Sequence, residues 1–246
     1  DNISPKSLYY DVNVEGTKNV LDAMRKNNIS RLIFTSSVAV YGININDADE
    51  SSKTNPFNDY GKSKLIAETE IVKWQREASK NRSALIIRPT VVFGENNRGN
   101  VYNLFNQINK NMFFMIGKGN NKKSIAYVDN LSDFIILKLN NFKNIVDIYN
   151  YSDKPDFTMK ELIELIFKSL NIKENKLIIP LFMAKAVAMI LDLISLVTKI
   201  KFPISSIRIK KFTSDSIINS KKLHKIFKPK YSIEKAIKKT IYYEFK

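Results

Sequence analysis

"FTSSVAVYG", residues 34–42, and "YGKSK", residues 60–64, are the two stretches from which the fold can be derived. The first is an apolar strand pattern that runs into two hydroxyls, Ser36 and Ser37. The second opens a helical pattern in which Tyr60 and Lys64 lie four residues apart, and therefore on one face of the helix. A strand that only filled a core could end at any turn, so the pattern predicts a polar site between a strand end and a helix start.

Strand and helix periodicities alternate around these stretches. Residues 31–37 and 83–94 predict buried strands, and the second leaves through Arg88 and Pro89, where a proline ends ladder pairing. Two helices are predicted with their apolar side chains inward: residues 7–28 with Val12, Val20, Leu21 and Met24, and residues 59–80 with Leu65, Ile66, Ile71 and Trp74. Such alternation predicts βαβ units and a parallel sheet, whose ligands bind beyond the carboxyl ends of the strands.

The pattern changes near residue 100, after which helices dominate. They are predicted near residues 129–140, 158–170 and 232–244, and Asp129 and Thr158 are the expected N-caps. We therefore predict an α/β chain with a Rossmann-like, doubly wound parallel sheet and a smaller, mixed C-terminal substrate lobe. The sheet with the Ser, Tyr and Lys residues takes residues 1–99, and residues 100–246 form mainly the substrate-binding lobe.

The most apolar segment, residues 180–200, is interrupted by Lys185 and Asp192. These two charges lie seven residues apart and share one helical face, whereas a membrane-spanning helix needs ~20 nearly uncharged residues. The segment therefore predicts a packed amphipathic helix and no transmembrane segment. A helix that lies on a membrane surface or at a subunit contact is the alternative.

Composition argues against several classes of function. The 246 residues include no Cys and one His, His224, which argues against disulfides, a Cys or His zinc site and a Ser-His triad, so no metal is predicted. A reducing, cytoplasmic compartment fits best. The 40 basic and 24 acidic residues give a net charge of +16, which attracts anionic ligands. The aromatic residues do not interleave with the lysines as a base-stacking surface requires, so nucleic-acid binding is not predicted.

Tyr60, Lys64 and Ser37 suit proton transfer. A Tyr acts as a general acid or base when its pKa falls from ~10 towards neutrality, and a cation at i+4 stabilises the phenolate. A Ser at a neighbouring strand end can hydrogen-bond both the phenol and a substrate oxygen. The three side chains are therefore expected to meet around one substrate oxygen.

Five motifs, in their order along the chain, resemble the extended short-chain dehydrogenase/reductases, and within them the NAD-dependent epimerase/dehydratase family: "NVEGTKNVLDA", "FTSSVAVYG", "YGKSK", "IIRPTVVFG" and "AYVDN". The resemblance implies an NAD- or NADP-dependent epimerase or reductase of nucleotide sugars, acting through a 4-keto intermediate and serving polysaccharide biosynthesis. It also implies a homodimer.

The resemblance assigns roles to individual residues. It makes the catalytic residues Ser37, Tyr60, Lys64 and Asn13. It places the cofactor against Ser36, Tyr60 and Lys64 and against the strand exit Arg88, Pro89, Thr90 and Val91. For the substrate it points to Asn97, Arg98 and Asn100, and to Lys123 and Arg208 as diphosphate ligands. For Lys123 and Arg208 a solvated surface charge is the alternative.

The Gly-rich turn of the family, G-x-x-G-x-x-G, is not found among the seven glycines of this chain. The sheet is therefore expected to be incomplete, with the first βαβ half absent from this sequence. Two alternatives stay open. One is a hydroxysteroid-type or lipid-linked alcohol dehydrogenase on the same fold, and the other is a non-catalytic, truncated remnant or binding module.

Overall fold

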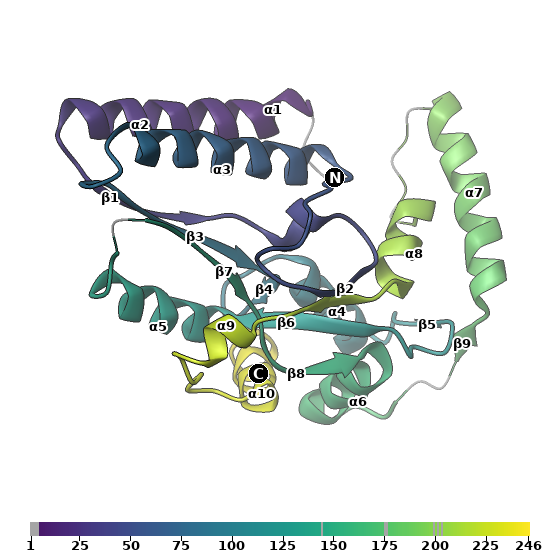
Figure 1. The fold of residues 1–246 in the computed structure, drawn as a ribbon. Coiled ribbons are helices and arrows are strands. Elements are labelled where there is room, and N and C mark those ends of the chain that lie inside the picture. The colour runs from purple at the N-terminus through teal and green to yellow at the C-terminus, as the bar shows by residue number, and fades with distance from the viewer. Residues whose placement is uncertain (1–4, 144, 175–176, 199, 201, 203) are drawn as a thin grey trace.

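The computed structural model describes residues 5–246 apart from 144, 175–176, 199, 201 and 203. Its main sheet has three parallel strands in the order β1 (Arg31–Thr35), β3 (Ser83–Pro89) and β7 (Val146–Tyr151). Helical segments lie on one face of this sheet (Figure 1): α1 (Ser7–Tyr10) running through the π-helical η1 (Asp11–Glu15) into α2 (Gly16–Lys26), and α3 (Asp59–Glu77). Helix α5 (Val128–Leu139) covers the other face. The predicted doubly wound α/β arrangement is confirmed.

Alternate side chains of β3 pack into two separate hydrophobic cores, because successive side chains of a strand point to opposite faces of the sheet. Ala84 and Ile86 pack with Ile71 and Trp74 of α3 on one side. On the other side the core consists of Leu85, Ile87, Leu131, Phe134, Tyr149, Tyr151, Ala126 and Leu223. Ile71 and Trp74 are fully buried, as predicted. Both faces of the central strand β3 are therefore covered by buried side chains and shielded from solvent.

The chain enters a second sheet directly after Pro89, the last residue of β3. The chain turns at Thr90 into β4 (Val91–Phe93), so the single strand predicted over residues 83–94 is two strands in different sheets. The path of the second sheet is β2 (Ile45–Ala48), β10 (Ser216–Ile218), β6 (Lys122–Tyr127) and β4, with β8 (Asp153–Thr158) antiparallel to β6. Short β5 (Met115–Ile116) and β9 (Ile178–Ile179) pair separately.

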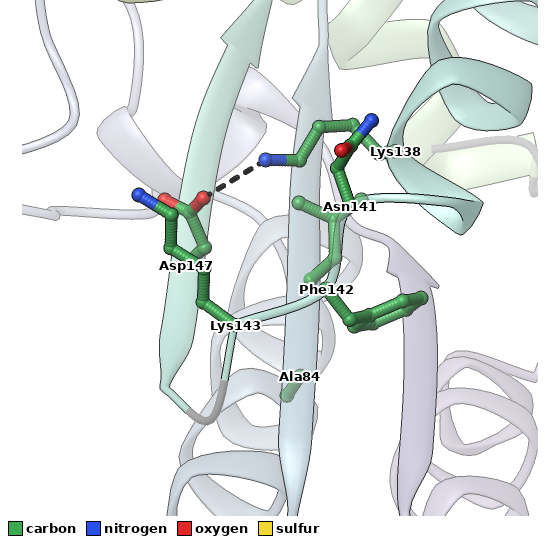
Figure 2. A pocket seen from close by; sticks show the side chains of 7 residues that line it. Ala84, Lys138, Asn141, Phe142, Lys143 and Asp147 are labelled. Atoms are coloured by element: carbon green, nitrogen blue, oxygen red, sulfur yellow. Dashed lines mark hydrogen bonds and ion pairs between the residues drawn. The ribbon is translucent and has the colours of Figure 1, made fainter.

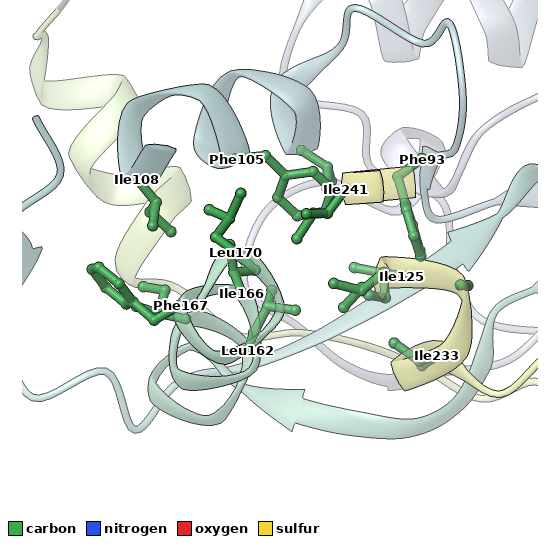
Figure 3. Packing of buried hydrophobic residues seen from close by; sticks show 14 of the residues in the cluster. Phe93, Phe105, Ile108, Ile125, Leu162, Ile166, Phe167, Leu170, Ile233 and Ile241 are labelled. Carbon is green, nitrogen blue, oxygen red and sulfur yellow. The ribbon is translucent and has the colours of Figure 1, made fainter. Parts of the chain in front are cut away.

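Three helices close the C-terminal core: α4 (Asn100–Asn109), α6 (Met159–Leu170) and α10 (Ile233–Phe245). Figure 3 shows Phe105, Ile166 and Ile241 converging from these three helices. Thr158 caps α6 through a capping box with Glu161, which confirms the predicted cap. Helix α5, however, begins at Val128 with Tyr127 at its N-cap, so the prediction of Asp129 as N-cap was wrong.

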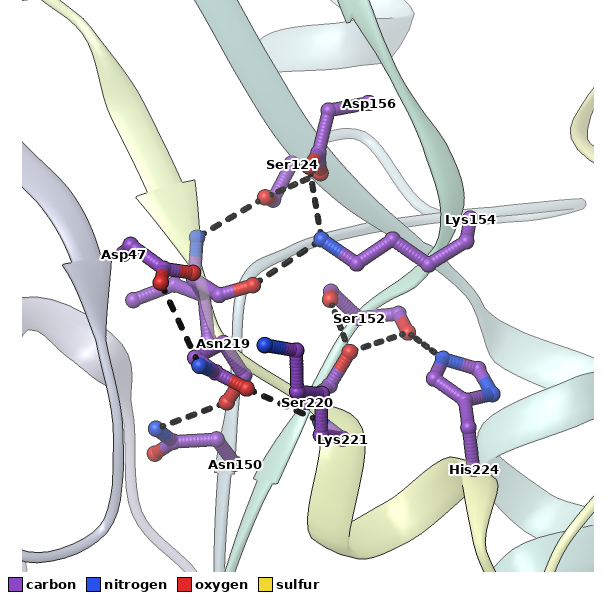
Figure 4. A network of polar contacts seen from close by, with 11 residues as sticks. Asp47, Ser124, Asn150, Ser152, Lys154, Asp156, Asn219, Ser220, Lys221 and His224 are labelled. Atoms are coloured by element: carbon purple, nitrogen blue, oxygen red, sulfur yellow. Dashed lines mark hydrogen bonds and ion pairs between the residues drawn. The ribbon is translucent and has the colours of Figure 1, made fainter.

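Polar side chains join β7, β8 and β10 beside the second sheet (Figure 4). The hydroxyls of Ser152 and Ser220 lie 2.8 Å apart, and His224 Nε2–H donates to the Ser152 carbonyl at 3.1 Å. His224 ends the short helix α9 (Lys221–His224). The one histidine of the chain therefore fastens α9 to the segment between β7 and β8.

Helix α7 (Leu181–Thr198) lies at the edge of the molecule, with α8 (Ser206–Thr213) beside it (Figure 1). The prediction of a packed helix over residues 180–200 was wrong: Ala184 and Ala188 are buried against Ile209 of α8, and most other apolar side chains of α7 are exposed. Within the described residues, α7 is one helix long and apolar enough to cross a membrane by length and composition.

Three apolar side chains that were expected to face inward are also exposed: Val12, Val20 and Ile66. Val12 lies in η1, where the π turn shifts the helical register by one residue relative to the pattern assumed from the sequence.

Candidate active site

The polar end of β1 and the start of α3 meet at one edge of the main sheet. Ser37 follows β1, and its Oγ accepts a hydrogen bond from Ala39 N at 3.1 Å, which starts the 3₁₀ turn η2 (Val38–Tyr41). Tyr60 is in the first turn of α3 and receives a hydrogen bond from the Ser37 hydroxyl. The structure therefore brings the predicted Ser and Tyr together at the carboxyl end of the sheet.

Gly61 makes this approach of α3 to η2 possible. A Cβ on Gly61 would lie 2.5 Å from the carbonyl oxygen of Ala39, a distance that real Cβ atoms do not reach. The Asn58 side chain caps the helix by accepting from Gly61 N at 2.8 Å. Gly61 was not singled out in the sequence, although its place directly after Tyr60 was a signal for close backbone contact.

Asn13 lies in η1, opposite the first turns of α3. Its Nδ2 donates to Ser63 Oγ at 3.0 Å, and Ser63 Oγ donates to the Tyr60 carbonyl at 2.9 Å. Thr17 Oγ1 donates to the Asn13 carbonyl at 2.7 Å, which compensates for the irregular helical turn. Asn13 is thus connected to the backbone of Tyr60 through Ser63, a link that the sequence did not reveal.

A pocket of about 230 Å³ opens beside these groups. It is lined by Leu8, Tyr9, Val12, Asn13, Tyr60 and Lys64. A second, much smaller hollow of about 10 Å³ lies between Lys138, Phe142 and Asp147 (Figure 2), with Ala84 near the start of β3 in its lining. That hollow has room for about one water. It is at the amino end of the strands, where ligands of such sheets do not bind.

Burial raises the pKa of Tyr60 above its usual value, and this outweighs the lowering by the Ser37 hydrogen bond. The ring of Tyr60 meets that of Tyr9 edge to face at 5.8 Å. The expected lowering of the Tyr60 pKa is therefore not met in the structure, and burial of the phenol is the main reason. The Lys64 ammonium donates to the Thr35 carbonyl at 3.0 Å and lies 4.9 Å from the centre of the Phe34 ring.

Lys64 itself is poised to lose its proton more readily than a surface lysine. Burial lowers its pKa, and the nearby Glu68 carboxylate partly opposes that shift. Because Lys64 also lines the pocket, its ammonium can donate hydrogen bonds to the hydroxyl groups of a ligand bound there.

Glu68 is the residue that sequence reasoning missed. It follows Lys64 by four residues on the same face of α3 and is bound to Arg88 through two contacts, Oε1 to Nε at 2.9 Å and Oε2 to Nη2 at 2.6 Å. It also accepts from Ser36 Oγ. Ser36, Glu68 and Arg88 are all buried, so the side chains of Ser36 and Arg88 are directed into the interior, and the cofactor contacts expected for these two residues stay a prediction.

The strand exit fits a cofactor through its backbone and one hydroxyl. Thr90 is buried, its N–H donates to the Tyr151 carbonyl at 2.9 Å, and its Oγ1 has no hydrogen-bond partner within the described part of the chain. Pro89 is buried at the end of β3, and Val91 is exposed at the start of β4. A buried hydroxyl without a hydrogen-bond partner costs free energy unless a ligand supplies that partner. This strand exit therefore suits a ligand group with polar atoms.

The substrate candidates divide into two groups. In the loop before α4, Asn97 Oδ1 accepts from Gly99 N at 2.8 Å and Arg98 pairs with Glu244 of α10, while Asn100 is exposed at the start of α4. None of the three lines the 230 Å³ pocket. Asn97 stabilises its own loop, and Arg98 holds that loop against the C-terminal helix.

Lys123 and Arg208 form the second group: Arg208 lies in α8, and Lys123 lies beside the end of that helix. Lys123 Nζ donates to the Lys211 and Ser214 carbonyls at 2.8 and 2.6 Å, and burial lowers its pKa to about 8. Lys211 Nζ lies 4.9 Å from the ring centre of Phe57, three residues before Tyr60. Burial lowers the pKa of Lys211, and the charge of Arg208 lowers it further. Positive charge therefore gathers beside the loop that leads to Tyr60.

Comparisons with known proteins agree with this arrangement. Residues 1–151 match the model of the NAD dependent epimerase/dehydratase family. The chain is 46% identical over its whole length to an N-acetyl-alpha-D-glucosaminyl-diphospho-ditrans,octacis-undecaprenol 4-epimerase of Escherichia coli O157:H7 and spans 74% of that protein. Over 74% of the chain it is 28% identical to a UDP-glucose 4-epimerase of Vibrio cholerae, of which it spans 56%.

Among solved structures, a UDP-glucuronic acid 4-epimerase of Bacillus cereus in complex with NAD superimposes on 99% of the chain with a TM-score of 0.76, at 17% identity and 70% coverage of that protein. This likeness shows the same Rossmann-like fold. Together with the family match and the 46% identical relative, it means that the chain belongs to the NAD-dependent epimerase/dehydratase family of enzymes, for which NAD is the cofactor.

Proposed function

We propose that this chain is an NAD-dependent 4-epimerase that acts on a hexosamine joined to its carrier through a diphosphate. The observation that carries the proposal is the meeting of Ser37, Tyr60 and Lys64 beside one pocket in a chain that is 46% identical to a 4-epimerase along its whole length. We further infer that the product serves polysaccharide assembly.

In this proposal Tyr60 takes the proton of the sugar 4-hydroxyl and later returns it to the 4-keto oxygen. Ser37 orients that oxygen through its hydroxyl, and Asn13 holds the first turn of α3 through Ser63. Lys64 binds ribose hydroxyls, and the exit at Thr90 meets the nicotinamide end. NAD, when bound, would supply the hydride acceptor for sugar C4 and a positive charge near the site. Burial raises the pKa of Tyr60, so its phenolate would depend on such a charge.

For the diphosphate we propose Lys211 and Arg208, which repel each other beside the Phe57 loop, as one side of the anion site. Two like charges held close gain from a shared anion between them. Lys123 acts behind them, because its ammonium fixes the carbonyls that end α8. The carrier is proposed to be a polyprenol rather than a uridine nucleotide, since the 46% identical relative is named for an undecaprenol-linked sugar.

The test is to offer the purified protein with NAD two substrates separately, N-acetylglucosaminyl diphospho-polyprenol in detergent and UDP-N-acetylglucosamine. Proton NMR of the sugar should show conversion to the 4-epimer with the lipid-linked substrate and no net formation of NADH. Equal or faster conversion of the UDP-sugar would overturn the choice of carrier. Steady accumulation of NADH with a keto product would overturn epimerisation in favour of an alcohol dehydrogenase.

A further inference from the structure

A surface helix normally buries its large apolar side chains, whereas helix α7 exposes them. With 3.6 residues per turn, its buried stripe is formed by Ala184 and Ala188, and the opposite half of its circumference is apolar. The exposed side chains on that half include Phe182 at 74%, Met189 at 66%, Leu193 at 68%, Leu196 at 79% and Val197 at 82% exposure. Monomeric soluble proteins rarely expose so continuous an apolar surface.

The charge around this surface is mainly positive. The described residues between 181 and 213, which contain α7 and α8, include four Lys or Arg residues and one Asp. That Asp192 is already engaged, because its Oδ2 accepts from Ser206 N at 3.0 Å. Lys185 is exposed beside the apolar half of α7, and Arg208 and Lys210 are exposed on α8. An apolar face with a basic border is complementary to an anionic lipid surface.

The path of the chain excludes a spanning orientation of α7. Before α7, β9 pairs with β5 of the main body. After it, α8 returns alongside α7: Ser206 binds Asp192, Ile209 packs on Ala184 and Ala188, and Lys123 holds the carbonyl of Ser214. Both ends of α7 are therefore attached on the same side, and the helix can enter only one leaflet.

We propose that α7 docks this protein on the surface of an anionic phospholipid bilayer, lying in the plane of the interface as a monotopic helix. The apolar half enters the boundary between headgroups and acyl chains, and Lys185 extends to the phosphates. Helix α8 then lies between the membrane and the Phe57 loop, since Lys211 contacts that ring. The active site is thereby held at the height of lipid headgroups. The inference stands on α7 and α8 alone and does not depend on the proposed epimerase activity.

The test uses co-sedimentation of the protein with vesicles of phosphatidylcholine, with and without phosphatidylglycerol. Binding should require phosphatidylglycerol and should weaken as salt screens the basic border. Leu193→Glu and Val197→Glu should each lower the partition coefficient at least about 10-fold, because each places a charge where a large apolar side chain would be buried. The matched control is Ile136→Glu on α5, 57% exposed and distant from α7, which should bind as the parent does.

A fluorescence experiment keeps the test independent of sedimentation. The chain has one Trp, the fully buried Trp74, so its emission is a constant background. In Leu193→Trp, phosphatidylglycerol vesicles should shift the emission to the blue. No shift and no sedimentation of the folded parent would overturn the proposal. A concentration-dependent dimer that Leu193→Glu dissociates, without vesicle binding, would overturn it too and assign the face to a second copy of the chain.

Discussion

Burial, together with the neighbouring Tyr9, raises the pKa of Tyr60 above its usual value. Tyr60→Phe removes only the hydroxyl. We expect kcat for epimerisation to fall by about 10²–10⁴-fold, the usual contribution of general acid–base catalysis. Urea denaturation should give nearly the parental free energy of unfolding. The measurement is the initial rate of epimerisation of the lipid-linked sugar by the purified protein with NAD.

Tyr243→Phe is the matched control, since Tyr243 is exposed and its hydroxyl donates to Asn96 Oδ1 at 3.3 Å. This variant should keep the parental rate. If Tyr60→Phe kept that rate as well, the proton-transfer group would have to be sought elsewhere.

Gly61 offers a sharper test of the geometry at the start of α3. Ala normally stabilises a helix relative to Gly by about 1 kcal/mol. At Gly61, however, a Cβ would meet the Ala39 carbonyl at 2.5 Å, so α3 would have to move away from η2 and from Ser37. We expect Gly61→Ala to lower both kcat/KM, by at least about 10-fold, and the free energy of unfolding, by about 1–3 kcal/mol.

Gly16→Ala is the control for this prediction. Gly16 begins α2 with helical angles, and an alanine Cβ at this position would have the Asp11 carbonyl oxygen as its nearest neighbour, at an ordinary 3.7 Å. This change should be neutral or stabilising by up to about 1 kcal/mol. Equal behaviour of the two alanine variants would mean that the close contact of α3 with η2 is not needed.

At the residue scale, the sequence was informative where chemistry and spacing coincide. Ser37, Tyr60 and Lys64 could be placed together because a strand end and a helix start define a common edge. Glu68 was accessible by the same logic, as the next i+4 position after Lys64, but its partner Arg88 comes from β3 and could not be paired with it without the tertiary structure. The position of the Lys64 ammonium on Thr35 is likewise a tertiary detail.

Among the elements, α2 and α3 are fastened at one end by Glu77. Its carboxylate binds Arg25 of α2 at 2.6 Å and Arg82 after α3 at 2.6 Å, and the Arg25 hydrogen bond is the main reason that the pKa of Glu77 falls to about 2. The folded pKa lies below the unfolded value, so this stabilisation is present above pH ~4.5 and is lost as the pH falls towards ~2. Because Glu77 is 44% exposed, solvent screening limits it to about 1 kcal/mol.

We therefore expect Glu77→Gln to lower the free energy of unfolding by about 1 kcal/mol at pH 7, with the difference from the parent shrinking between pH ~4.5 and ~2. Urea denaturation across that range measures it. Glu70→Gln, which breaks one i,i+3 contact with Lys73, should cost no more than about 0.5 kcal/mol. A pH-independent difference for Glu77→Gln would show that the two arginines do not stabilise its charge.

The elements themselves were predictable to the extent that their signals are local. The strand after residue 30, the helix after Asn58 and the capping box at Thr158 follow from periodicity and caps. The bend at Pro89 was visible, but which sheet β4 would join was not, because that pairing with β6 is formed by distant residues. Helix α7 was wrongly predicted to be packed, because an apolar sequence does not reveal whether another element of the fold covers its apolar face.

On the scale of the whole molecule, the chain passes from the main sheet to the second sheet three times, from β1 to β2, from β3 into β4 and from β7 into β8. The boundary expected near residue 99 stays a prediction, although β7 and α5 come from beyond it and complete the layers of the main sheet. Asn150, fully buried near the end of β7, lies at the third of these passages. This residue is the polar joint between the half that carries Tyr60 and the half that carries α7 and α8.

Asn150 makes contacts to both sheets. Its Oδ1 accepts from the Tyr41 hydroxyl at 2.8 Å, and its Nδ2 donates to the Ala48 carbonyl of β2 at 3.1 Å and towards the Asn219 carbonyl at 3.4 Å (Figure 4 shows the last). Tyr41 in turn accepts from Arg88 at 2.7 Å, so the joint continues to the Glu68–Arg88 pair. Replacing Asn150 by Leu keeps the size but leaves buried polar groups unpaired on both sides of the joint.

We expect Asn150→Leu to lower the free energy of unfolding by about 2–4 kcal/mol, since an unsatisfied buried group costs about 1–3 kcal/mol. The control is Asn141→Leu, where an exposed side chain donates to the carbonyl of Leu137 at 3.0 Å, and where the change should stay within about 0.5 kcal/mol. Urea denaturation followed by circular dichroism measures both. Loss of activity should accompany the Asn150 variant, because the Tyr41 turn follows directly from Ser37. If Asn150→Leu were as mild as Asn141→Leu, apolar packing alone would hold the two sheets together.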